Sequence, residues 1–200
     1  MRKTLILVAL VVALSAGTVA AQSTYGIDTV HSNVGFKVRH LVAKVTGQFT
    51  EFDGTITADF QHLDNSSVEF VIKTASIDTK NEKRDGHLRS PDFFDAEKFP
   101  EITFKSSKIT KIDSDSYAVA GILSMHGVNN PVVLTVDFLG EMTAMGGTRA
   151  GFEVTTTVNR QDFGVSWNRT LDQGGFVLGD DVEININLEA VKQEPSTDNS

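Results

Sequence analysis

The chain has 200 residues, with 18 Lys+Arg against 26 Asp+Glu and no cysteine. Its net charge of −8 argues against binding to the phosphate backbone of nucleic acids and against electrostatic docking on anionic lipid, since both need a basic surface. The absence of cysteine excludes disulfides, a thiol nucleophile and a thiolate metal site, so packing and backbone pairing must stabilise the fold.

The first 21 residues have the order of a cleavable secretory signal. Arg2 and Lys3 precede an apolar run over residues 5–14, and small residues lead to Ala21. The apolar run is shorter than the about 20 residues that a membrane-spanning helix needs. We therefore expect a signal peptide over residues 1–21, one folded domain over 22–192 and a polar, disordered tail over 193–200.

From residue 34 onward, apolar and polar residues alternate with period two in eight successive segments. This pattern is typical of strands with one buried and one solvated face, and hence of an antiparallel sheet. The segments are residues 34–38, 52–60, 68–72, 102–104, 119–125, 132–138, 152–158 and 182–188. Turn-forming residues at 64–66, 113–116, 129–131 and 145–147 separate several of them, which favours a meander.

Eight antiparallel strands must protect their edges, either as two packed sheets or as a closed barrel. Residues 47–60 and 132–142 run past the usual five or six residues of a strand, and long, tilted strands favour a barrel. We therefore predict an all-β fold, an eight-stranded antiparallel lipocalin-like barrel whose interior can hold one elongated ligand.

Two segments interrupt the alternation. Residues 81–99 are highly charged and contain three phenylalanines, and Pro91 and Pro100 punctuate the segment, which predicts one or two short helical turns. Residues 160–179 form a glycine-rich loop that contains Trp167, the only tryptophan. We expect Trp167 to lie over one end of the barrel, where it either closes the cavity or packs as a plug without contacting a ligand.

Four blocks of the sequence resemble the YceI-like family, and their order along the chain is the family's order. They are YGIDTVHSNVGFKVRHL, SIDTKNEKRDGHLRSPDFFDAEKFPEITFKS, YAVAGILSMHGVNNPV and RQDFGVSWN with LGDDVEI, between residues 25 and 191. The resemblance implies a lipocalin-like barrel that holds a polyisoprenoid lipid, such as an isoprenoid quinone or a prenyl phosphate. It also implies a periplasmic or secreted carrier that takes part in lipid transport.

The apolar faces of the predicted strands are the candidate ligand site, because a prenyl chain binds by removing apolar area from water. The candidate lining residues are Phe36, Val38, Phe52, Phe70, Ile72, Phe104, Val119, Leu123, Val136, Phe138, Phe152, Val154 and Trp167. A core filled by these side chains is the alternative interpretation of the same pattern. A register error of one residue would turn every one of these side chains to the other face.

Arg84, Asp85 and His87 are the candidates for contact with a polar head group, since the arginine fork donates paired hydrogen bonds to phosphate. The alternative is that Arg84 and Asp85 pair with each other and cap the short helix. The five histidines are scattered without the close spacing of zinc ligands, so we predict no metal site.

The sequence contains no G-x-S-x-G motif or other pairing of a nucleophile with a base. We therefore predict a binding protein and not an enzyme, without a cofactor, a nucleic-acid partner or a stable membrane anchor. Two alternatives stay open, a barrel enzyme that acts on a lipid and a stress-related interaction module with a filled core. The sequence leaves the oligomeric state open, with a homodimer among the alternatives.

Overall fold

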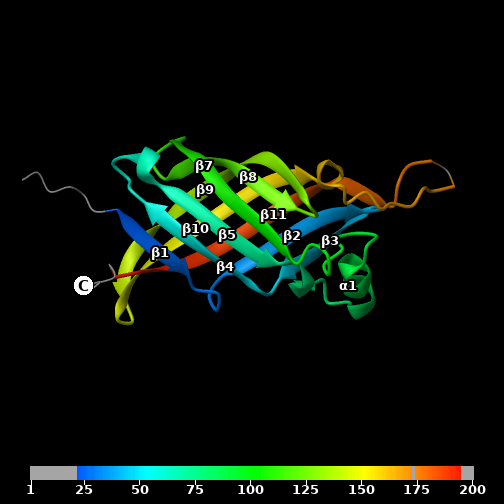
Figure 1. The fold of residues 1–200 in the computed structure, drawn as a ribbon, viewed down its shortest axis with the longest axis horizontal. Coiled ribbons are helices and arrows are strands. Elements are labelled where there is room, and N and C mark those ends of the chain that lie inside the picture. The colour runs from blue at the N-terminus through cyan, green and yellow to red at the C-terminus, as the bar shows by residue number, and fades with distance from the viewer. Residues whose placement is uncertain (1–21, 173, 195–200) are drawn as a thin grey trace, which may run out of the picture.

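A computed structural model describes residues 22–172 and 174–194 of the chain (Figure 1). The strands are β1 (Ser23–Ile27), β2 (Asn33–His40), β3 (Ala43–Phe49), β4 (Phe52–Ala58), β5 (Ser67–Lys73), β6 (Ile77–Asp78), β7 (Glu101–Lys111), β8 (Ser116–Met125), β9 (Val128–Ala144), β10 (Gly147–Asn159) and β11 (Leu178–Lys192). One α-helix, α1 (Glu82–Arg89), and three short 3-10 turns, η1 (Leu63–Asn65), η2 (Thr74–Ser76) and η3 (Arg160–Phe163), lie in the connections.

These strands close into an antiparallel barrel of eight long strands, as predicted. The two halves of β11 pair with β2 and with β1, so β1 and β2 are one interrupted strand. In the same way, β3 and β4 form a second interrupted strand, because β3 pairs with β2 and β4 pairs with β1. The third consists of β5 and β6, because β5 pairs with β4 and β6 pairs with β3. The remaining strands follow in chain order from β7 to β11, and the pairing of β1 with β11 closes the ring.

Local polar contacts explain two of the three interruptions, which the alternating pattern does not reveal. Asp28 accepts hydrogen bonds from the backbone N–H groups of Val30 and His31, which fixes the turn between β1 and β2. At η2, the Ser76 hydroxyl donates to the Lys73 carbonyl at 2.7 Å. A side chain thus replaces ladder hydrogen bonds at each of these two points, so the strand can bend there.

The turn predicted at residues 129–131 was placed three residues too late. The β8–β9 hairpin turns at His126 and Gly127, with φ of 52° and 78°, and Met125 pairs with Val128. Two successive positive φ values are what a two-residue hairpin turn requires. Pro131 lies inside β9, opposite Ile122, even though proline is uncommon in the interior of a strand.

The charged segment forms α1, as the sequence predicts. The Asn81 side chain caps its first turn by accepting a hydrogen bond from the Arg84 N–H, and Pro91 follows its last residues. The predicted signal and residues 195–200 of the predicted tail lie outside the described residues. Within the described part, Gln193 still donates to the Thr24 carbonyl at 2.7 Å and so extends the pairing of β11.

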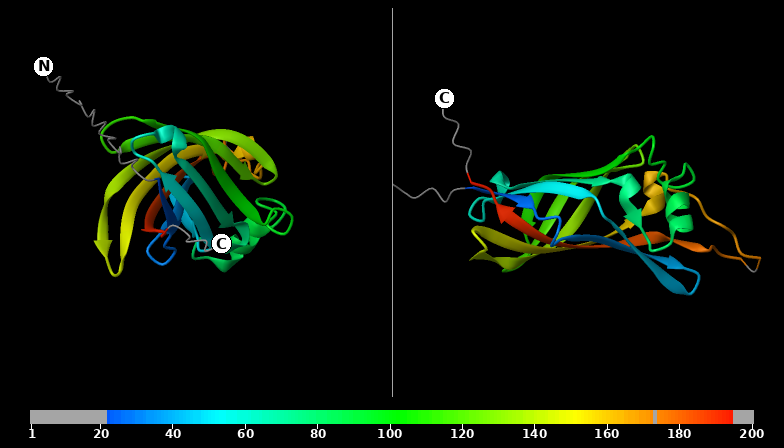
Figure 2. Two further views of the ribbon diagram at one scale, coloured as in Figure 1. Left: turned by 60° about the vertical axis from the view of Figure 1, so that its left-hand side comes forward. Right: turned by 90° about the horizontal axis from the view of Figure 1, so that it is seen from below.

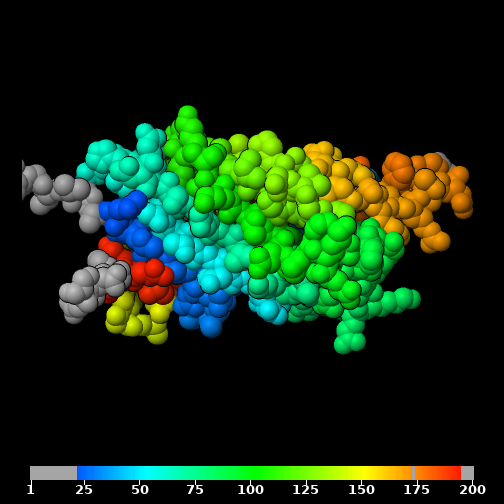
Figure 3. Space-filling model, in the orientation of Figure 1, coloured from blue at the N-terminus to red at the C-terminus, as the bar shows by residue number. Residues whose placement is uncertain are grey.

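The barrel has two distinct ends, which we call the helical end and the terminal end. The helical end carries α1, η3 and the β2–β3 hairpin, at the right of Figure 1. The terminal end carries the start of β1, the end of β11, η1 and the β9–β10 turn, at the left of Figure 1. Figure 2 shows the β2–β3 hairpin and the loop before β11 projecting from the helical end. Figure 3 shows the loop before β11, in orange, protruding from the surface. None of the helices in the described ranges is long and apolar enough to cross a bilayer.

Candidate functional site

A cavity of about 250 Å³ runs inside the barrel, so the interior is not filled. Its wall extends from Leu88, Phe94 and Val165 at the helical end to Phe60 and Leu63 at the terminal end. Apart from a few polar side chains, the wall consists of aliphatic and aromatic residues from all eight long strands. An apolar cavity of this kind holds a ligand by burial of apolar surface and not by hydrogen bonds.

The cavity is long and narrow. Leu178 and Leu188 both line it, and they lie ten residues apart on β11. At a rise of roughly 3.3 Å per residue and a strand tilt of roughly 40°, this separation corresponds to roughly 25 Å along the barrel axis. Because a volume of about 250 Å³ is spread over that length, the cavity suits a slender chain better than a compact ligand.

The structure places ten of the thirteen predicted lining residues on the cavity wall. They are Phe36, Val38, Phe70, Ile72, Phe104, Val119, Leu123, Val136, Phe152 and Val154. The predicted inward register is therefore right for these residues, because a slip of one position would have turned them outward. Their contact with a ligand stays a prediction.

Phe52, Phe138 and Trp167 lie off the wall. Phe52 stacks against Phe70, with ring centroids 5.9 Å apart, and Phe138 packs against Phe60 and Phe152 at centroid distances of 5.1 and 5.5 Å. These two rings support wall residues. Trp167 packs outside the cavity at the helical end, against Phe93, and whether it contacts a ligand stays a prediction.

Glycines on neighbouring strands keep three of the wall phenylalanines flat against the barrel. A Cβ atom at Gly54 would lie 2.5 Å from the Phe70 ring, and a Cβ atom at Gly121 would lie 2.5 Å from the Phe104 ring. Gly47, which pairs directly with Phe36, would likewise collide with the ring of that residue. Each ring thus lies over a glycine, and a larger residue there would collide with the ring and, at Gly54 and Gly121, also with a backbone carbonyl oxygen of the adjacent strand.

Arg84 and Asp85 bond to the same threonine and do not line the cavity. The buried Asp85 carboxylate accepts from the N–H and the hydroxyl of Thr79, the N–H at 2.9 Å. The Arg84 guanidinium donates to the Thr79 hydroxyl and carbonyl oxygens at 2.6 and 2.8 Å. The two side chains therefore fix the start of α1 against β6, a structural role close to the capping alternative considered above.

His87 lies in an aromatic cluster that joins α1 to the loop after η3. The centroid of its ring lies 5.0 Å from that of Phe93 and 5.1 Å from that of Trp167, and the ring centroids of Phe93 and Trp167 are 5.1 Å apart. The His87 Nε2 atom also lies 2.9 Å from the Asp92 carboxylate. Since Phe93 lines the cavity and His87 is partly exposed, this cluster separates the cavity from solvent at the helical end.

Arg160 is the one charged residue on the described cavity wall, and it is 4% exposed. Its guanidinium donates to the carbonyls of Val165, Trp167 and Gly179 and to the Asp180 carboxylate, at 2.6–3.0 Å. Burial lowers the pKa of Arg160, and Asp180 partly offsets the effect. Because these acceptors occupy the guanidinium, it ties the loop after η3 to β11.

The terminal end is closed by the segment between β4 and β5. Asp59 accepts hydrogen bonds from the backbone N–H groups of Gln61 and His62 and from the Asn65 amide. The Asn65 hydrogen bond is the largest cause that holds the pKa of Asp59 below its ordinary value. Phe60 in this segment lines the cavity and is 49% exposed, so this one side chain extends from the cavity wall to the protein surface.

Tyr25 and Glu141 tie β1 to β9 at the same end. The Tyr25 hydroxyl donates to the Glu141 carboxylate across the barrel end, and the Tyr25 side chain is almost fully buried. Burial, together with the neighbouring carboxylate, raises the pKa of Tyr25 to about 12. The phenol is therefore neutral at physiological pH and acts as a hydrogen-bond donor.

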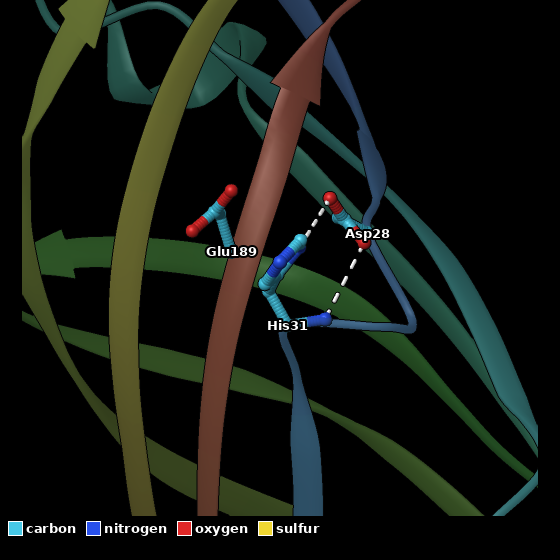
Figure 4. A group of neighbouring side chains, drawn as sticks. All are labelled: Asp28, His31 and Glu189. Carbon is cyan, nitrogen blue, oxygen red and sulfur yellow. Dashed lines mark hydrogen bonds and ion pairs between the residues drawn. The ribbon is translucent and has the colours of Figure 1, made fainter. Parts of the chain in front are cut away.

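One cluster has the residue types of a metal site. Asp28, His31 and Glu189 offer ligand atoms within 4.8 Å of one another. Figure 4 shows the three side chains beside β11 and the hydrogen bonds between His31 and Asp28. The Arg149 guanidinium, however, bonds to Asp28 at 2.8 Å and to Glu189 at 2.5 Å. A cation would have to displace this arginine, so the cluster acts as an ion-pair network that joins β10 and β11 to the β1–β2 turn.

Sequence reasoning missed the wall residues that lie outside the regular strands. Leu88, Phe93 and Phe94 line the cavity from the charged segment, and Val165 does so from the loop after η3. No periodicity marks them, because irregular backbone does not alternate. The clustered aromatics of an otherwise charged segment were the only available signal, since exposed loops seldom need several phenylalanines.

The model of the YceI-like domain matches residues 25–190 of the chain. A UPF0312 protein of Vibrio cholerae is 38% identical over 169 residues, which cover 82% of this chain and 89% of that protein. A UPF0312 protein of Staphylococcus aureus is 35% identical over 170 residues, which cover 84% of this chain and 96% of that protein.

Solved structures share the same barrel. The YceI protein of Campylobacter jejuni is 33% identical, with a TM-score of 0.67 over 84% of this chain and 97% of that chain. BcnA of Burkholderia cenocepacia has a TM-score of 0.72 at 24% identity, over 82% of this chain and 98% of that one. A polyisoprenoid-binding domain of Saccharophagus degradans has a TM-score of 0.64 at 15% identity, over 84% and 98% of the two chains. The last two likenesses show the fold alone.

Proposed function

Because the chain belongs to the YceI-like family, we propose that it is an exported carrier that holds a polyisoprenoid lipid in its barrel. The observation that carries this proposal is the narrow apolar cavity that runs from one barrel end to the other. A flexible prenyl chain matches both its length and its lack of polar groups. The resemblance in fold to a polyisoprenoid-binding domain is consistent with this ligand class.

In this proposal the prenyl chain lies along the cavity axis and gains about 25 cal/mol for each Å² of apolar surface removed from water. Several isoprene units offset the entropy lost when the flexible chain is ordered. The head group, an isoprenoid quinone ring or a prenyl phosphate, lies at the helical end, where His87 and Trp167 combine polar and aromatic groups beside the cavity. The protein itself contributes no chemical step.

The first test is native mass spectrometry of protein purified from the compartment to which cells export it, followed by organic extraction of whatever co-purifies. We expect a bound polyisoprenoid, and the mass of the polypeptide will show whether residues 1–21 have been removed. A ligand-free mass, together with no uptake of added quinone or prenyl phosphate, would contradict the carrier function.

A matched pair of substitutions locates the ligand. Val119 faces the cavity on β8 and is buried, whereas Val133 on the adjacent strand β9 faces outward and is 58% exposed. Val119→Phe fills part of the cavity and should weaken uptake of a quinone by roughly tenfold, whereas Val133→Phe should leave uptake unchanged. Thermal unfolding of both variants shows that each is folded. Equal uptake by both would place the ligand outside the barrel.

A further inference from the structure

Two loops carry exposed apolar side chains beyond the helical end. The β2–β3 hairpin turns at Leu41 and Val42, and the loop before β11 carries Leu171 and Phe176. We call these four side chains the apolar tip. Val42 is fully exposed and Phe176 is 54% exposed. The two loops lie side by side, because the Leu41 N–H donates to the Val177 carbonyl at 2.8 Å. Figure 2 shows both loops projecting from the same end of the barrel.

The residue types of this hairpin turn are unusual. Two-residue turns favour glycine, asparagine or aspartate, since they require positive φ and lie in water. Here Leu41 adopts a φ of 53°, which costs free energy for a leucine, and Val42 has its whole side chain in solvent. Apolar residues at a strained, exposed turn indicate a surface that is covered when the protein functions.

The β2–β3 half of the apolar tip is basic, in contrast to the acidic chain as a whole. This hairpin, residues 33–49, contains Lys37, Arg39 and Lys44 and no Asp or Glu, in a chain whose net charge is −8. All three basic side chains are exposed, and one of them, Lys44, pairs with Glu183 on β11 at 2.5 Å. In the loop before β11 the charges of Arg169 and Asp172 cancel, so the positive border of the apolar tip comes from the hairpin, and this border complements the interface of an anionic bilayer.

The apolar tip is also continuous with the cavity wall. Val38 on β2 and Leu178 on β11 both line the cavity, three residues before Leu41 and two residues after Phe176. A lipid that leaves a bilayer at the apolar tip would therefore meet apolar side chains without a polar gap.

We propose that the apolar tip docks reversibly on an anionic lipid bilayer, with Val42 and Phe176 inserted among the head groups and Lys37, Arg39 and Lys44 close to the lipid charges. Docking in this orientation directs the helical end of the cavity at the membrane. The low net hydrophobicity of so small a surface makes the contact transient and not an anchor. Docking needs no ligand in the cavity, so it can be tested apart from the carrier function.

The opposite end of the molecule provides a matched control. The β9–β10 hairpin also exposes apolar side chains, with Leu139, Met142 and Met145 at its tip. Its neighbouring charged residues are Glu141 and Arg149, and the Arg149 guanidinium is already paired with Asp28 and Glu189, so this tip has no positive border to attract an anionic surface. Charge, and not apolar exposure alone, therefore decides which end faces the bilayer.

The test is flotation of the purified protein with vesicles of phosphatidylcholine alone and of phosphatidylcholine mixed with phosphatidylglycerol. We expect binding to the mixed vesicles, weakened by added salt, and much weaker binding to phosphatidylcholine. Val42→Asp and Phe176→Asp should each weaken binding by roughly tenfold, and Arg39→Glu should do the same by removing a positive charge and adding a negative one. Met145→Asp should leave binding unchanged.

All four side chains are exposed, so thermal unfolding should confirm that the variants remain folded. No binding of the wild type to either vesicle, or equal loss in the Met145→Asp variant, would overturn the proposal. Sedimentation velocity measures the oligomeric state and so tests whether the apolar tip binds a second copy of the chain instead of a bilayer. A wild-type dimer that Val42→Asp converts to a monomer would assign the apolar tip to self-association and also overturn the proposal.

Discussion

The two ends of the barrel are closed in different ways. At the helical end, buried charged side chains tie the loops to the strands, since Arg160 has four acceptors and Asp85 accepts two hydrogen bonds from Thr79. At the terminal end, a short segment folds around the single carboxylate of Asp59 and leaves Phe60 half exposed.

This difference indicates how each end responds to a ligand. The helical end loses several interdependent hydrogen bonds if it opens, so it stays rigid and can present a fixed surface to a head group or a membrane. When its short segment moves, the terminal end loses the local hydrogen bonds of Asp59 and a single long-range one, from the Gln22 amide to the Asn65 carbonyl, so it is the part of the barrel most able to adapt to the end of a prenyl chain.

Arg160→Ala tests the helical end and should have the largest effect. Removal of the guanidinium leaves three carbonyls without this donor and leaves the Asp180 carboxylate with the Gln161 amide alone, which should cost about 2–3 kcal/mol of unfolding free energy. Urea unfolding measures the loss, and the fluorescence of Trp167 should shift to longer wavelength as its loop loosens. Arg169→Ala, at an exposed position in the same loop, is the control. Similar stability of the two variants would show that the helical end does not depend on Arg160.

Gly47→Ala tests the width of the cavity near the helical end. The new methyl group would collide with the Phe36 ring and with the Thr79 methyl group, so the ring should move into the cavity. We expect about 1–2 kcal/mol of destabilisation and a roughly tenfold loss of quinone affinity, measured by calorimetry. Gly86→Ala is the control, because nothing lies within 4 Å of a Cβ atom there. Unchanged affinity in the Gly47→Ala variant would show that Phe36 does not set the width.

Acidification should act on the terminal end, with the smallest effect. The folded-state pKa of Asp59 lies below its ordinary value of 3.8, so the hydrogen bonds of its carboxylate stabilise the fold above that pH. This contribution is lost as the pH falls through the lower, folded-state pKa. The amide resonances of Gln61 and His62 should therefore shift below pH 3.8 in NMR spectra of the wild type. The same resonances in Asp59→Asn should not titrate, and a wild-type midpoint above 3.8 would contradict the assignment.

The barrel could be predicted from the sequence because each strand has a buried and a solvated face. The alternation located one strand segment in each of the eight long strands and turned ten wall residues inward, Phe104 and Val119 among them. The interruptions at residues 28–32, 50–51 and 74–76 were not predicted, since single side chains such as Asp28 and Ser76 create them. The β8–β9 turn was misplaced because Asn129 and Asn130 have turn-like composition but lie in β9.

The candidate site was predictable only in part. Periodicity shows which face of a strand is buried, but it does not show which side chains on that face reach the cavity, since Phe52 stacks against Phe70 without lining the cavity. Periodicity gives no information about loops, so Phe93, Phe94 and Val165 were not predicted as wall residues. The roles of Arg84 and Asp85 depend on Thr79, a residue that is close in space but carries no motif.

The glycines beneath the wall phenylalanines have a consequence for how such a barrel diversifies. Gly47, Gly54 and Gly121 do not line the cavity, yet each decides how far an aromatic ring stands out from the wall. Ligand selectivity can therefore change through positions that never touch the ligand. A single methyl group, added behind one ring, would shift the preference of the barrel towards thinner or shorter chains and leave its inner surface chemically the same.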